Sequence, residues 1–232
     1  MSNERYRRWD DADAVARFAS KTPGDFFATE THFLEGRTDD IASVLDIGCA
    51  SGRLVELLAS YGCHPAYTGV DISAEQVASA RALYPEASFH RGNALALALP
   101  GGFDLVNATG VMQHEPRLHD LIRRMVGWSR CYVLFDVKLS DLDEDVIDIT
   151  RSHAGTAQHP LFFNVLSARR FLDFLRDLDG IAAAAVFGYE TPPNRNTTLP
   201  PEITRLVSAG VFLGVGEGPA ALSVDLPEGL LL

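Results

Sequence analysis

Two aspartates that follow consecutive apolar segments are the residues of this sequence best placed to do chemistry. Asp46 lies in SVLDIGCASGRL (43–54), where an apolar run opens into a turn of small residues. Asp71 ends the next apolar run, in TGVDIS, about 20 residues after that turn. A carboxylate at the end of a parallel strand and at this distance can accept hydrogen bonds from both ribose hydroxyls of a nucleoside.

The small residues after Asp46 favour close contact with a ligand. Gly48 and Gly52 let the backbone approach where a Cβ would collide, and Ala50 is nearly as small. The helix expected to follow would add free N–H groups and the positive end of its dipole. We therefore expect residues 44–52 to form the floor of a nucleotide-binding crevice.

The order of the acid and the glycines indicates what kind of nucleotide would bind. A dinucleotide-binding turn has the pattern G-x-G-x-x-G and holds a diphosphate at a helix N-terminus. Here the order is D-x-G-x-x-x-G, with Asp46 two residues before Gly48. A carboxylate repels a diphosphate and attracts a cationic amino group. The pattern therefore predicts a nucleoside that carries a positive charge.

A sheet must bring these strand ends together, and the apolar pattern predicts one. From residue 41 onward apolar segments alternate with helical stripes, which is typical of βαβ units and a mostly parallel sheet. The predicted strands are 44–47, 66–70, 88–90, 103–107 and 131–137, and the predicted helices are 53–61, 117–128 and those beginning at Ser73 and Ser167. No clear helix separates the last extended segments, so we expect an antiparallel pair at one sheet edge; these segments are 181–190, 211–215 and 221–226. Residues 4–35 are predicted to be mainly helical, with a break at 22–25.

Four motifs resemble those of the class I S-adenosylmethionine-dependent methyltransferases. VLDIGCASG resembles the first motif of that family, with Ala50 where many members have glycine, and GVDIS resembles its ribose-binding motif. HRGNALALALPGGFDLV resembles the segment that flanks adenine, with Asn93 where many members have Asp. NATGVMQHEP resembles the stretch after the fourth strand, with Gln113 in place of the first residue of a frequent His pair. The resemblance covers roughly residues 40–190.

The resemblance implies a fold, a cofactor and a set of binding residues. The fold would be an α/β, Rossmann-like, doubly wound, mostly parallel seven-stranded sheet with a reversed terminal strand pair. Residues 1–40 would form a helical lid over the acceptor pocket, and residues 41–232 the cofactor-binding domain. Asp46 and the backbone near Gly48 would face the methionine part of S-adenosylmethionine, Asp71 the ribose, Ile72 the adenine face, Asn93 and Ala94 the adenine edge, and Asn107 the methionine end. Cys49, Ala50 and Gly52 complete the set of residues expected at the cofactor.

A methyltransferase does not require a catalytic base, because the sulfonium methyl is already activated and positioning supplies much of the rate. A hydroxyl acceptor needs a base, whereas an amine needs only to be neutral. His114 and Asp136 are the catalytic candidates, and Asp136 is expected at the end of the fifth strand. His114 could instead cap a helix or pack in the pocket wall. Further candidates are His153, His159 and Tyr189.

The composition of the chain disfavours several classes of binding partner. The formal net charge is −11, with 20 Lys+Arg against 31 Asp+Glu, which disfavours a nucleic acid or an anionic membrane. No His/Cys set has the spacing of metal ligands, and the three cysteines are expected to be reduced thiols in a cytoplasmic protein. The N-terminus has no apolar stretch of the signal-peptide kind, and no apolar run approaches the ~20 residues of a membrane helix.

We therefore expect a small-molecule acceptor that is methylated on an O or N atom by a monomer or homodimer. Residues 1–40 and the loop 138–166 would form the acceptor pocket. Its expected aromatic wall consists of Trp9, Phe26, Phe27, Phe162 and Phe163. Two alternatives stay open: a nicotinamide-dependent Rossmann oxidoreductase, and a non-catalytic regulator that binds the nucleoside on the same fold.

Overall fold

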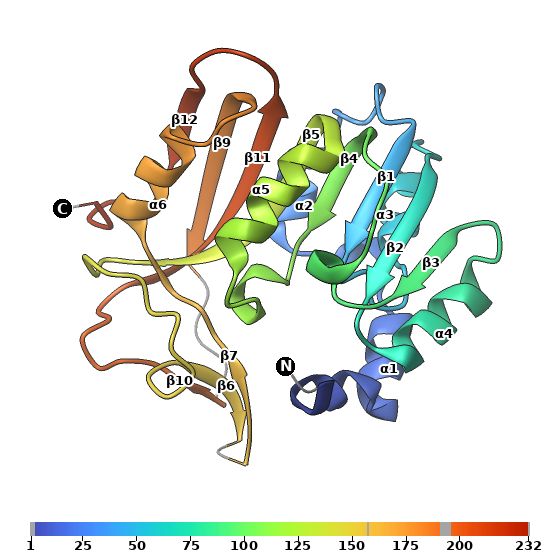
Figure 1. Ribbon diagram of the computed structural model, residues 1–232, viewed down its shortest axis with the longest axis horizontal. Coiled ribbons are helices and arrows are strands. Elements are labelled where there is room, and N and C mark those ends of the chain that lie inside the picture. Colours follow the sequence, from blue (N-terminus) through green and yellow to red (C-terminus); the bar gives the residue numbers. More distant parts are fainter. Residues whose placement is uncertain (1–2, 157, 191–195, 232) are drawn as a thin grey trace.

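The central feature of the computed structural model is a mixed sheet flanked by helices on both faces (Figure 1). The structure describes residues 3–156, 158–190 and 196–231. Within these residues the main sheet has nine strands in the order β12-β9-β11-β5-β4-β1-β2-β3, with β8 paired to β5. The strands are β1 (Ser43–Ile47), β2 (Ala66–Asp71), β3 (Ser88–Arg91), β4 (Phe103–Ala108), β5 (Ser129–Ser140), β8 (Leu166–Ser167), β9 (Ile181–Glu190), β11 (Leu206–Val215) and β12 (Ala221–Asp225).

The mostly parallel, doubly wound sheet predicted from the sequence is confirmed, and two details differ. The sheet has nine strands instead of the seven that the resemblance implies, because the predicted extended segment 221–226 forms β12 and the short strand β8 was not predicted. Only β11 is reversed, because it pairs antiparallel with both β5 and β9, whereas β12 is parallel to β9. The expected antiparallel pair is thus a single reversed strand inserted between two strands of the common direction.

Alternation of apolar side chains along the strands builds two cores. Val44 and Leu45 are both fully buried but belong to different clusters, as expected where side chains alternate between sheet faces and helices cover each face. Val44 packs with α2 (Ala28–Leu34), α3 (Leu54–Ser60) and α4 (Ala74–Leu83). Leu45 packs in the cluster that holds α5 (Leu118–Trp128) and α6 (Ala168–Arg176).

The segment before β1 is helical and lies beside the carboxyl end of the sheet. It consists of the 3-10 helix η1 (Asn3–Asp10), α1 (Ala12–Ala19), the 3-10 turn η2 (Pro23–Asp25) and α2. The Asp11 side chain caps α1 by accepting hydrogen bonds from the backbone N–H groups of Asp13 and Ala14. The Asp10 carboxylate accepts a hydrogen bond from the Ser73 hydroxyl at 2.6 Å, which ties η1 to the start of α4.

The region expected as a loop over residues 138–166 contains its own strands. β6 (His153–Thr156) and β7 (His159–Phe162) form a hairpin, and β10 (Thr197–Thr198) joins it to make a second, three-stranded sheet. Figure 1 shows this small sheet projecting from the body below the main sheet. Two further 3-10 turns, η3 (Ala94–Ala96) and η4 (Met112–His114), follow β3 and β4.

Helix α2 sits on β11 so closely that only glycine fits beneath it. A Cβ at Gly210 would lie 2.8 Å from two side-chain atoms of Thr29 and 3.1 Å from Phe33. We expect Gly210→Ala to lower the free energy of unfolding by about 1–3 kcal/mol through overpacking. Gly127→Ala is the control, because Gly127 lies in α5 with no atom within 4 Å of the added carbon. Urea denaturation measures both variants, and equal stability of the two would contradict the close packing of α2.

Candidate functional site

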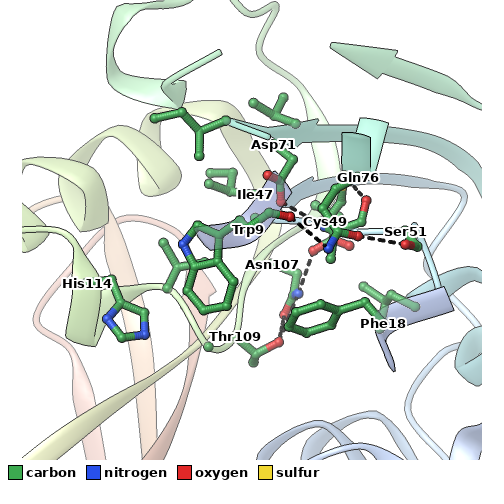
Figure 2. A pocket seen from close by; sticks show the side chains of 18 of the residues that line it. Trp9, Phe18, Ile47, Cys49, Ser51, Asp71, Gln76, Asn107, Thr109 and His114 are labelled. Carbon is green, nitrogen blue, oxygen red and sulfur yellow. Dashed lines mark hydrogen bonds between the residues drawn. The ribbon is translucent and has the colours of Figure 1, made fainter. Parts of the chain in front are cut away.

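A cavity of about 500 Å³ opens at the carboxyl ends of β1, β2 and β4. The strand order places β1 between β4 and β2, which is the point in an open α/β sheet where ligands bind. Residues of the helical segment before β1 close its other side, among them Trp9, Phe18 and Phe26. Figure 2 shows Trp9 and Phe18 facing Asp71 and Asn107 across this space.

All but one of the residues predicted at the cofactor line this cavity. They are Asp46, Gly48, Cys49, Ala50, Asp71, Ile72, Asn93, Ala94 and Asn107. Gly52 is not among the residues that line the cavity. Its φ is +76°, and a Cβ at this position would lie 3.0 Å from the Phe89 ring. Gly52 therefore serves to turn the chain into α3 against Phe89.

The turn after β1 is held by the end of β2. The backbone N–H groups of Gly48 and Cys49 donate to the Val70 carbonyl at 2.7 and 3.1 Å. Gly48 has a φ of +71°, and a Cβ there would clash with Cγ2 of Val111. Ala50 adopts a positive φ of +46°, a conformation that costs energy for a residue other than glycine. Close packing against Val111 thus adds a reason for Gly48 that the sequence did not reveal.

Asp71 fastens this turn from the neighbouring strand. Its Oδ2 accepts a hydrogen bond from the Ala50 N–H at 2.9 Å, and its Oδ1 accepts one from the Ser73 N–H at 2.8 Å. Burial raises the pKa of Asp71, and these two backbone hydrogen bonds oppose the rise. Each carboxylate oxygen keeps a second lone pair, so the group can still accept hydrogen bonds from a ligand in the cavity.

Asp46 is buried among neutral donors. It accepts hydrogen bonds from the Tyr67 hydroxyl and, at 2.8 Å, from the Asn107 amide. Burial raises the pKa of Asp46 to about 6, because these two hydrogen bonds only partly offset desolvation. The Asn107 amide also lies 3.2 Å from the Thr109 hydroxyl, which extends the polar network along the cavity wall.

On the side where adenine was expected, Asn93 acts as a helix cap. Its φ is −78°, and its Oδ1 accepts a hydrogen bond from the Leu95 N–H at 2.9 Å at the start of η3. The Asn93 amide nitrogen stays available, and Ile72 and Ala94 offer apolar surface beside it.

Of the two catalytic candidates, only His114 lines the cavity. Its Nδ1–H donates to the Phe162 carbonyl at 2.7 Å, and its ring lies 5.7 Å from the Trp9 ring. Burial lowers the pKa of His114 to about 4, so the ring is neutral at pH 7 and weakly basic. His114 is therefore suited to accept a hydrogen bond at Nε2 and poorly suited to remove a proton.

The prediction that Asp136 lies at the end of the fifth strand is wrong. β5 continues to Ser140, so Asp136 lies within the strand instead of at its end, and it is not among the residues that line the cavity. Its carboxylate accepts a hydrogen bond from the Gly110 N–H at 2.5 Å and lies 3.8 Å from the Lys138 ammonium. Asp136 therefore holds the turn after β4 in place.

Several other expected pocket residues lie away from the cavity. His153 and His159 belong to the small sheet, and Tyr189 in β9 pairs its hydroxyl with that of Thr29 at 3.3 Å. Trp9, Phe26 and Phe27 of the expected aromatic wall do line the cavity, whereas Phe162 and Phe163 do not.

Sequence reasoning missed a third buried acid in the cavity wall, Glu30. It is 2% exposed, and its Oε2 has no hydrogen-bond partner within the described part of the chain. Burial and the neighbouring Asp136 raise the pKa of Glu30 to about 7. A sequence signal existed: Glu30 shares one helix face with Phe33 and Leu34, so a carboxyl falls in the buried stripe of α2.

Three positively charged side chains line the cavity, and each contacts another side chain of the wall or its surroundings. The Arg17 guanidinium lies 5.1 Å from the ring centre of Phe18. The Lys21 ammonium lies between 5.1 and 5.5 Å from the ring centres of Phe18, Phe26 and Phe27. Arg53 is paired with Glu56, and its guanidinium also donates to the Lys21 carbonyl. Within the described residues no group of three or more His, Cys, Asp or Glu side chains could hold a metal ion. No described helix combines the length and apolar character needed to cross a bilayer.

Comparison with known proteins agrees with this geometry. Residues 44–131 match the family described as a methyltransferase domain. Relatives named trans-aconitate 2-methyltransferase are 38% identical over 107 residues (Rhodopseudomonas palustris) and 35% identical over 91 residues (Azoarcus sp.). The matched stretches cover 46% and 38% of this chain but only 42% and 36% of those relatives.

Two solved structures share the fold at low sequence identity. Magnesium protoporphyrin IX methyltransferase from Synechocystis, with bound S-adenosylmethionine, superposes with a TM-score of 0.52 at 15% identity, over 92% of this chain and 90% of that one. A chain from the Haloferax volcanii complex of the Trm112 methyltransferase activator with a methyltransferase gives a TM-score of 0.62 at 15% identity, over 94% and 99% of the two chains.

The hydrogen bond from Tyr67 to Asp46 should matter most when Asp46 is ionised. The pKa of Asp46 is raised from 3.8 to about 6, so its contribution to stability is present below pH 4 and is lost as the pH rises through about 6. The Tyr67 hydroxyl limits that loss by stabilising the charged form. We expect Tyr67→Phe to lower the free energy of unfolding by about 1.5–3 kcal/mol at pH 7.5 and by clearly less at pH 4.5.

Chemical denaturation at the two pH values measures this difference. Tyr61→Phe is the control, because Tyr61 is only partly buried, at the end of α3. An equal loss at both pH values would show that Asp46 does not titrate in this range.

Proposed function

We propose that the protein transfers a methyl group from S-adenosylmethionine to an oxygen or nitrogen atom of a small molecule. The match of residues 44–131 to a methyltransferase domain supports this proposal. The observation that carries this proposal is the pair of buried carboxyls, Asp46 and Asp71, that line one cavity from adjacent strands. Their positions suit a nucleoside with a cationic group, which S-adenosylmethionine is.

The residues present fit this cofactor. A cavity of about 500 Å³ lies within the range of pockets that bind small molecules. Asp71 would hold the ribose hydroxyls through its remaining lone pairs, and Ile72 and Ala94 would contact adenine. Asp46, oriented by Tyr67 and Asn107, would face the cationic methionine end. When bound, S-adenosylmethionine supplies a methyl group already activated for transfer.

The remaining cavity wall would bind the acceptor and exclude water. Trp9, Phe18, Phe26 and Phe27 supply an aromatic surface from the segment that we propose as a lid, residues 1–40. Neutral His114 would orient the acceptor by accepting a hydrogen bond. Much of the rate of such a reaction comes from holding the reacting atoms in line at about 3 Å.

The names of the relatives raise trans-aconitate, a carboxylate, as a candidate acceptor. The cationic residues that line this cavity give it little support, because Lys21 packs over three phenyl rings, Arg17 lies over the Phe18 ring and Arg53 is paired with Glu56. All three cysteines are free thiols, which fits a reducing compartment, and we propose a cytoplasmic location.

Replacing Asp71 tests the cofactor site. We expect Asp71→Asn to weaken binding of S-adenosylmethionine by one to two orders of magnitude, since charge-assisted hydrogen bonds to the ribose contribute about 1.5–3 kcal/mol each. Isothermal titration calorimetry measures this, with NADH as a second ligand for which we expect no binding. Asp148→Asn is the matched control, because the Asp148 side chain accepts its hydrogen bonds from Thr150 at an exposed site.

Two results would contradict the proposal. One is equal affinity of wild type and Asp71→Asn for S-adenosylmethionine while both unfold at the same denaturant concentration. The other is tighter binding of NADH than of S-adenosylmethionine, which would favour the oxidoreductase alternative.

A further inference from the structure

Glu30 carries a buried carboxyl group in the cavity wall, and one of its oxygens has no hydrogen-bond partner in the described chain. It lies on α2, which packs directly against β11 because Gly210 of that strand has no Cβ. Thr29 pairs with Tyr189 on one side of Glu30, and the nearby Thr109 hydroxyl lowers the pKa of the Glu30 carboxyl in part. Its Oε2 nevertheless has no partner in the described chain. A carboxyl oxygen left in this state costs free energy unless a ligand supplies the missing donor.

A second unsatisfied acceptor lines the same cavity. Gln113 donates through its Nε2 to the Gly110 carbonyl at 3.0 Å, which fixes the orientation of the amide. Its Oε1 is buried and has no partner in the described chain. Gly110 is itself held by Asp136, so the Gln113 oxygen belongs to a rigid turn. Glu30 and Gln113 thus give the cavity two oxygens that both require a donor.

The charged and titratable groups around Glu30 come from several elements. Asp136 on β5 acts on it as a negative charge, and Lys21, between α1 and η2, acts as a positive one. Tyr189 on β9 and Tyr61 after α3 are close enough for their own pKa values to be raised by the Glu30 charge. Lys138 is 3.8 Å from Asp136 and offsets that acid in part.

We propose that Glu30 and Gln113 form the subsite for the reactive group of the methyl acceptor, and that Glu30 removes its proton. The acceptor is then a hydroxyl or amine compound with an apolar body that packs on the aromatic wall, and its reactive group is not a carboxylate. A carboxylate would place its negative charge against two acceptor oxygens and would leave both without a donor. This inference rests on the proposed function.

The proposed methyl transfer forms one bond and breaks one. A bond forms between the acceptor oxygen or nitrogen and the methyl carbon, and the bond between that carbon and sulfur breaks. The sulfur leaves as a neutral thioether, and the acceptor proton passes to the Glu30 carboxylate and then to solvent. A pKa of about 7, raised by burial and Asp136, suits a group that must accept and release a proton near neutral pH. His114, with a pKa near 4, is far less basic.

Three probes of similar shape test the subsite: benzylamine, benzyl alcohol and benzoate. Their binding to the protein saturated with S-adenosylhomocysteine is measured by ligand-observed NMR. We expect benzylamine and benzyl alcohol to bind and benzoate to bind at least tenfold more weakly. Benzylamine affinity should rise between pH 6 and 8 as Glu30 ionises, because the probe is a cation throughout that range.

Glu30→Gln is the informative variant, since it keeps the size of the side chain and removes its charge. We expect it to weaken benzylamine binding by about ten- to a hundredfold and to flatten the pH dependence, while affinity for S-adenosylhomocysteine stays unchanged. Glu35→Gln, an exposed substitution just after α2, is the control and should alter neither.

The outcomes separate this inference from the proposed function. Failure of S-adenosylhomocysteine to bind the wild type would refute the proposed function. Normal binding of S-adenosylhomocysteine together with equal or tighter binding of benzoate, or with no binding of any probe, would refute only the Glu30 subsite. The ranking of probes on the wild type needs no variant, so the test does not depend on the folding of Glu30→Gln.

Discussion

Buried carboxyl groups at the carboxyl edge of the sheet are the constraint that shapes this molecule. Asp46, Asp71, Asp136 and Glu30 are all at most 9% exposed, and burial raises the pKa of each. Around them the fold supplies mainly neutral donors: backbone N–H groups, Tyr67, Asn107 and Thr109. Such a region holds negative charge at a cost in stability, and a cationic ligand lowers that cost.

The four acids divide between two tasks because they lie on different elements. Asp46 and Asp71 belong to β1 and β2, inside the stretch that matches the methyltransferase domain. Asp136 stabilises the turn after β4 and stays out of the cavity. Glu30 comes from the helical segment before that stretch. The part of the cavity that we propose for the cofactor therefore lies in the stretch that matches the methyltransferase domain, and Glu30 of the proposed acceptor subsite comes from the helical segment before it.

The sequence was most informative where function depends on local order along the chain. Asp46, the glycine turn and Asp71 follow each other within one βαβ unit, so strand ends and spacing were enough to place them together. Asp136 was misplaced because the end of β5 could not be located from an apolar run that continues to Ser140. Glu30 was not predicted as a site residue, because its burial depends on the packing of α2 against Gly210, some 180 residues later in the chain. The strand β8 was not predicted, because its two residues pair with β5 only when the fold brings the two segments together.

Proton release on cofactor binding measures most directly whether a bound cation stabilises the ionised form of these buried carboxyl groups. S-adenosylmethionine is titrated calorimetrically into the protein at pH 6, near the pKa of Asp46, in two buffers that differ in heat of ionisation. The difference in apparent enthalpy gives the number of protons exchanged. We predict a net release of protons, because the bound cation lowers the pKa of Asp46. Uptake of protons, or binding without any exchange, would show that the cation does not face the buried carboxyl.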